Sequence, residues 1–98
     1  MKQMWSIFTD DMDKCVFTGS PIVERHHIFY NMGGKMKEKC EKYGFTAPLR
    51  PDLHPNGVHA GKQAKEIDAK LKADCQLYYE SHYGTREEFI NEFGKSVL

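Results

Sequence analysis

Four of the five histidines in this chain fall into two short clusters. His26 and His27 are adjacent in the run IVERHHIFY, and His54 and His59 flank a Pro-Asn-Gly turn in LHPNGVH. A strand that supplies one imidazole and a turn before a helix that supplies two more can together form a metal site. Three protein ligands leave one coordination position open, as in catalytic sites. The remaining imidazole, with a pKa near neutrality, then suits a general base. Imidazole ligands favour zinc, nickel, copper or iron over magnesium.

The elements that must position these histidines can be predicted from the chain pattern. Residues 22–30 are β-branched and aromatic, which is typical of a strand, and residues 4–8 and 15–19 predict two shorter strands. Residues 35–44 have helical spacing and end at a glycine. Residues 45–58 contain three prolines and one Asn-Gly, which predict an extended stretch and a tight turn.

Two further helices are predicted in the second half of the chain. The longer begins near His59 and ends near His82, with an apolar stripe formed by Ala64, Ile67, Leu71, Cys75 and Tyr78. Its other positions are mostly charged, namely Lys62, Lys65, Glu66, Asp68, Lys70 and Lys72. Thr85 and Glu88 then form a capping box, and the last helix ends at Gly94. The order of elements predicts a small α+β domain.

Composition narrows the class of protein. The 98 residues predict a single domain, 1–98, and no apolar run approaches the ~20 residues of a membrane span. The first residues, MKQMWSIFTDDMDK, do not resemble a signal peptide, so we expect an intracellular protein. Three widely spaced cysteines do not predict a disulfide framework. With 14 basic and 14 acidic residues, charge alone does not predict a nucleic-acid-binding protein.

The histidine clusters carry a resemblance to a known family. The run ERHHIF, followed by a loop, a short helix and then PLRPDLHPNGVH opening a long helix, resembles the HNH (ββα-metal, or His-Me finger) endonucleases. The small HNH proteins of bacteriophages and prophages are the most similar, over roughly residues 14–98. The resemblance implies a ββα-metal core with a β-hairpin, a long helix after the second metal motif and a C-terminal helix. It also implies a location in the cytoplasm of a bacterial host cell.

The resemblance assigns a role to each clustered histidine. His27 would be the general base that takes a proton from water, and the metal ligands would be His26, His54 and His59. One divalent ion (zinc, nickel, manganese or magnesium) would neutralise the scissile phosphate and stabilise the leaving 3′ oxygen. The products would carry a 5′ phosphate and a 3′ hydroxyl.

The chain departs from the family pattern in two places. The asparagine that orients the base in the family has no clear match, and Thr46 and Asn56 are the candidates to replace it. Many relatives also bind a structural zinc through paired cysteines, where this chain has Thr18, Arg50 and Leu53. We therefore expect the fold to be held by its apolar core or by association.

DNA is the expected partner. The candidates for phosphate contacts are Arg25, Arg50, Lys62 and Lys65. No residue predicts readout of base edges, so we expect weak sequence preference. A homodimer or a partner protein would make double-strand cleavage easier for so small a domain.

Two other functions are compatible with the same residues. In the first, His26, His54, His59 and Cys15 close a tetrahedral zinc site in a non-catalytic module that binds DNA or a protein. In the second, the histidines are incidental in a small interaction protein. Neutral net charge favours these two, whereas the extra adjacent histidine favours the nuclease, because a structural site needs no spare base.

Overall fold

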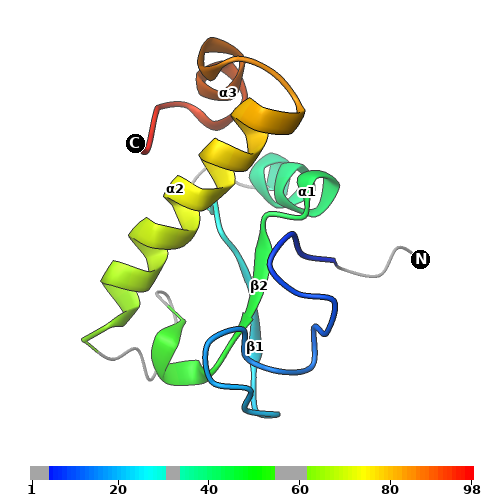
Figure 1. The fold of residues 1–98 in the computed structure, drawn as a ribbon, viewed down its shortest axis with the longest axis vertical. Helices are drawn as coiled ribbons and strands as arrows, with labels where there is room; N and C mark the ends of the chain where they lie inside the picture. Colours follow the sequence, from blue (N-terminus) through cyan, green and yellow to red (C-terminus); the bar gives the residue numbers. More distant parts are fainter. Residues whose placement is uncertain (1–4, 31–33, 55–61) are drawn as a thin grey trace.

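The computed structural model describes residues 5–30, 34–54 and 62–98 (Figure 1). Its elements are, in chain order, β1 (Glu24–His27), α1 (Gly34–Tyr43), β2 (Thr46–Leu49), the short 3-10 helix η1 (Pro51–Leu53), α2 (Ala64–His82) and α3 (Arg86–Phe93). The predicted α+β class is confirmed, and the two-stranded hairpin followed by a long helix is compatible with a ββα layout. None of the helices in these residues is long and apolar enough to cross a membrane.

The hairpin determines where the adjacent histidines point. β1 and β2 are antiparallel, with His26 opposite Ala47 and His27 opposite Thr46. Successive side chains of a strand point to opposite faces, so the two imidazoles lie on different sides of the hairpin. All four residues of β2 are buried, whereas β1 is buried only at His26.

Different elements cover the two sides of the hairpin (Figure 1). α2 runs along one side, and the N-terminal segment and α1 lie on the other. The N-terminal segment bonds to β2 and the end of α1: Ser6 Oγ donates to Thr46 O at 2.6 Å, and Ile7 N donates to Gly44 O at 2.9 Å. Gly44 has φ +73°, and a Cβ there would lie 2.7 Å from the ring of Trp5. A side chain at this position would therefore be both strained and blocked.

An aromatic core at the end of the molecule near α1 and α3 fastens the helices together. Phe29, at the end of the hairpin, packs on Phe93 with ring centroids 4.7 Å apart. Glu92 of α3 accepts hydrogen bonds from the hydroxyls of Tyr43 in α1 and Tyr79 in α2. This core leaves the opposite end of the hairpin, where η1 meets the start of α2, to form the histidine site.

Several boundaries differ from those predicted. Residues 5–8 and 15–19 are not strands; the second of these runs is a tight turn, closed by a 2.9 Å bond from Gly19 N to Cys15 O. α2 begins at Ala64, later than the predicted start near His59. Lys62 lies in the turn before the helix. The capping box of α3 and its end at Gly94 (φ +97°) are as predicted.

The buried stripe of α2 also differs from the predicted one. Its buried members include Ala64, Leu71, Cys75 and Tyr79, whereas Tyr78 is only partly buried. Asp68 and Lys72 were expected to face solvent, but their side chains are only 16% and 22% exposed. They are covered because they pack against Tyr30, which follows β1.

Candidate metal centre

His26 lies at the centre of the candidate site, between the hairpin and α2. Its side chain is 2% exposed, and Nε2 lies 3.7 Å from Oδ1 of Asp68 in α2. The ring of His54, which follows η1, stands edge-on to it with centroids 4.5 Å apart. The structure therefore brings together two of the three predicted ligands, His26 and His54.

Asp68 is the functional candidate that the sequence analysis missed. Its Oδ2 accepts hydrogen bonds from Lys72 Nζ at 2.9 Å and from the hydroxyl of Tyr30 at 3.5 Å. Lys72 also lies over the Tyr30 ring, 4.7 Å from its centroid. Burial raises the pKa of Asp68, but its interactions with His26 and Lys72 outweigh burial and hold the pKa below the ordinary value. The carboxylate is therefore ionised and fixed in place.

A signal for Asp68 was present in the sequence. The spacing Ala64, Asp68, Leu71, Cys75, Tyr79 is four, three, four and four, which places the carboxylate inside the buried stripe of a helix. An ionisable residue in such a stripe has to be paired or to bind a ligand. A stripe defined by apolar residues alone does not include Asp68.

Three buried polar atoms have no hydrogen-bond partner within the described residues: His26 Nε2, His27 Nε2 and Asp68 Oδ1. Buried polar groups are nearly always satisfied, and leaving one unsatisfied costs ~1–3 kcal/mol. The 3.7 Å between His26 Nε2 and Asp68 Oδ1 is too long for a hydrogen bond. The unpaired atoms of His26 and Asp68 lie on one face of the hairpin and fit two ligands of a bound cation, whereas His27 Nε2 lies on the other face, beside Glu41.

His54 is in the protonation state that binds metals. Burial and the neighbouring His26 lower its pKa, which Glu24 and Asp68 oppose. The neutral imidazole is therefore favoured near pH 7, and neutral imidazole is the ligand form. Within residues 5–30, 34–54 and 62–98, no three His, Cys, Asp or Glu side chains are already arranged as a metal-binding group. The third predicted ligand, His59, lies outside these residues.

His27 faces the other side of the hairpin. Its Nε2 lies 3.6 Å from Oε2 of Glu41 in α1, and its side chain is 20% exposed. Burial lowers its pKa; Glu41 opposes the shift, and Lys37 and His26 add to it. The imidazole is therefore neutral near pH 7 and can accept a proton, as a general base must.

The candidates for orienting this base have different positions. Thr46 lies directly opposite His27 in the hairpin, but its hydroxyl donates to the carbonyl of Trp5. Asn56 lies outside the described residues. Glu41 is the polar side chain that the structure places beside His27.

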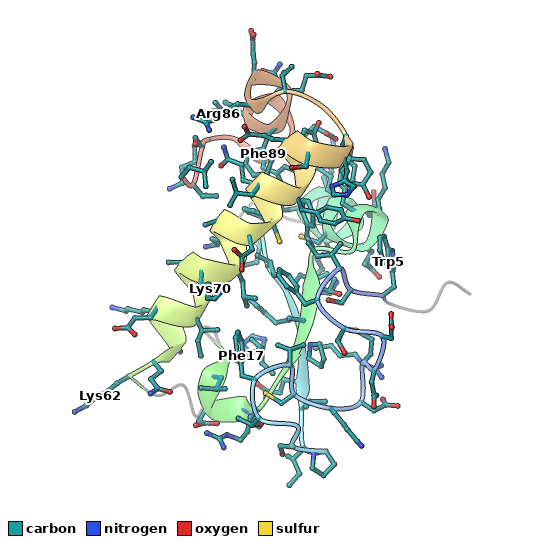
Figure 2. The ribbon with its side chains drawn as sticks, in the orientation of Figure 1. Trp5, Phe17, Lys62, Lys70, Arg86 and Phe89 are labelled. Atoms are coloured by element: carbon teal, nitrogen blue, oxygen red, sulfur yellow. The ribbon has the colours of Figure 1, made fainter. Side chains whose placement is uncertain are left out.

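The four cations predicted to contact DNA fall into two pairs. Arg25 is bound to Asp13 at 2.8 Å, and Arg50 is bound to Asp52 through two nitrogens. Lys62 and Lys65 are exposed at the start of α2, and Figure 2 shows Lys62 extending away from the molecule. The lysines are therefore more available to phosphates than the arginines are.

Cys15, the fourth ligand of the zinc-module alternative, has other partners. Burial raises the pKa of its thiol, but bonds to the Thr18 hydroxyl and to the backbone of Arg50, Phe17 and Thr18 lower it overall. These groups stabilise the thiolate locally, and none of them belongs to the cluster around His26.

Comparison of the chain with protein-family models, with curated proteins and with solved structures gave no match.

Proposed function

We propose that this domain is an HNH-type, metal-dependent DNA endonuclease that hydrolyses phosphodiester bonds, and that it derives from a phage or prophage. The observation that carries the proposal is the cluster of His26 and His54 beside orphaned, buried donor atoms, with a second, neutral imidazole at the next position of the strand. A purely structural site has no use for that second imidazole.

The roles of the residues follow from their surroundings. His26 and His54 would hold a divalent ion, with His59 as the further ligand that the resemblance implies. When bound, that ion would neutralise charge on the scissile phosphate and stabilise the leaving oxygen. His27 would take the proton from the attacking water, because its lowered pKa keeps the imidazole neutral.

The outer edge of β1 is where a phosphate could meet both imidazoles. Within the part of the chain that the structure describes, the sheet has two strands, and backbone bonds from Ile7 and Val16 go to Gly44 and Pro48, on the β2 side. A phosphate along the outer edge of β1 would then have His26 on one face of the hairpin and His27 on the other. Lys62 and Lys65 would contact flanking phosphates, because both are exposed near the start of α2, next to the site.

The test is nicking of supercoiled plasmid by the purified protein with magnesium, manganese, nickel, cobalt or zinc. We expect metal-dependent nicking that falls ~100- to 10,000-fold in His27→Ala, the range for loss of a general base, while the metal stays bound. His82→Ala is the matched control, because His82 is an exposed histidine at the far end of α2, hydrogen-bonded to Tyr78 O. Equal rates in wild type and His27→Ala would reject His27 as the base.

A second function, a non-catalytic zinc module that binds DNA or a protein, is favoured by the zero net charge and by the separation of the two imidazoles on opposite faces. It predicts tightly held zinc, no nicking with any metal, and unfolding on chelation, because structural zinc contributes directly to folding. The plasmid assay and a chelator melt therefore separate the two proposals.

A further inference from the structure

We propose that Asp68 joins His26 as a ligand of the metal ion; within the described residues, His26, His54 and Asp68 are not yet arranged as a complete metal-binding group. The inference rests on the metal site of the proposed function. It adds a ligand from the second turn of α2, on the face of the hairpin that carries His26.

The distance between the two orphaned atoms supports shared coordination. Two ligand atoms, each about 2.0–2.2 Å from one zinc ion, stand roughly 3–4 Å apart. His26 Nε2 and Asp68 Oδ1 are 3.7 Å apart, both are buried, and neither has a hydrogen-bond partner among the described residues. The pair therefore has the separation of two donors to one ion and exceeds that of a hydrogen bond.

The other oxygen of Asp68 is held as a second shell would hold it. Oδ2 accepts from Lys72 and from Tyr30, and Lys72 is itself packed over the Tyr30 ring. Metal-bound carboxylates are commonly fixed by hydrogen bonds of this kind. Lys72 and Tyr30 thus occupy one oxygen and leave Oδ1 directed toward His26.

The additional carboxylate changes which ions suit the site. An all-imidazole set favours zinc, nickel or copper, whereas carboxylate oxygen extends the range toward manganese and magnesium. A negative ligand also offsets part of the charge of a dication in a buried place, where an unpaired charge is costly.

Two neighbouring substitutions separate coordination from simple ion pairing. Asp68→Asn removes the charge with little change of shape, and Lys72→Met removes the partner while keeping much of the stem. If Asp68 only pairs with Lys72, the two variants should have the same effect. If Asp68 binds the ion, Asp68→Asn should weaken binding about 100-fold or more, whereas Lys72→Met, which removes only a second-shell contact, should weaken it less, by at most the ~10–100-fold of such partners.

The experiment is titration of each full-length variant with Co²⁺ alone, followed by its visible spectrum, with plasmid nicking measured in parallel. Asp74→Asn is the matched control, because Asp74 forms the same i,i+4 pair with Lys70 on the exposed side of α2. We expect Asp68→Asn to weaken Co²⁺ binding about 100-fold or more and to change the spectrum of the bound ion, above the ~10–100-fold typical of a second-shell partner. Asp74→Asn should change neither.

The outcomes distinguish this inference from the proposed function. An Asp68-dependent cobalt spectrum without nicking supports the ligand and rejects the nuclease. If nicking and cobalt binding are the same in wild type and Asp68→Asn, the nuclease is supported and the ligand assignment is overturned. An equal loss of cobalt binding in Asp68→Asn and Lys72→Met also overturns the ligand assignment. If wild type binds no Co²⁺, the ligand assignment is overturned whatever the nicking assay shows.

Discussion

The two faces of the β1–β2 hairpin hold the same pair of groups, an imidazole beside a carboxylate, in opposite environments. On the α2 face, His26 is 2% exposed and its carboxylate, Asp68, is fixed by Lys72. On the α1 face, His27 is 20% exposed and its carboxylate, Glu41, is 51% exposed. The buried face has the rigidity that holding an ion requires, whereas on the α1 face part of the His27 ring is exposed although its Nε2 atom is buried.

The largest expected effect is on metal affinity and comes from replacing the two histidines of β1 one at a time. His26→Ala should weaken binding of the divalent ion about 100-fold or more, because it removes a ligand and leaves Asp68 with one partner fewer. His27→Ala should change that affinity less than about threefold, since its imidazole faces α1. Isothermal titration of both variants measures the contrast.

Equal losses of affinity in the two variants would mean that both imidazoles hold the ion, and the division between the faces would be wrong. Circular dichroism of each metal-free variant is the control, because Asp68 loses a buried neighbour in His26→Ala and the fold must be shown to persist.

The chain pattern predicted local structure better than it predicted the site. The Thr85 capping box and the end of α3 at Gly94, which neighbours in sequence determine, were predicted correctly, but the equally local turn at residues 15–19 was predicted as a strand. The residues 5–8 are placed by isolated long-range bonds to β2 and α1, for which alternation in sequence gives no signal. His26 and His54 were predicted to meet, and their rings do.

Asp68 could not be placed from hydropathy alone. Its burial depends on Tyr30 and Lys72, one of which lies 38 residues away in the chain. Similarly, the alternation of a strand predicts that His26 and His27 point apart, but not that each finds a carboxylate on a different helix. Such pairings are set by tertiary packing.

A smaller effect shows which face DNA approaches. Replacing Lys62 and Lys65 by glutamine should weaken plasmid binding and reduce the slope of log affinity against log salt by about 2, because each phosphate contact contributes about 0.9. Both lysines are exposed next to the start of α2. Binding measured over a range of salt concentrations at alkaline pH, where imidazoles are neutral, tests this.

The matched control lies on the other face. Lys35 and Lys37 are equally exposed, in α1, and their replacement by glutamine should leave the slope unchanged. If the α1 pair changed the slope and the α2 pair did not, DNA would approach from the His27 side, and the placement of the phosphate at the edge of β1 would have to be revised.

The smallest expected effect is on the pH dependence of nicking and concerns only His27 and Glu41, on the α1 face. The pKa of His27 lies below its ordinary value of 6.5, so nicking should be fully developed at pH 7 and should fall as pH decreases through that lower pKa. Glu41 raises this pKa, whereas Lys37 and His26 lower it. Glu41→Gln should therefore move the acid limb to still lower pH and leave the rate above about pH 7 unchanged. Single-turnover nicking between about pH 5 and 8 measures the shift. A limb displaced instead by Asp68→Asn, and untouched by Glu41→Gln, would place the titrating base on the buried face and reverse the roles of the two imidazoles.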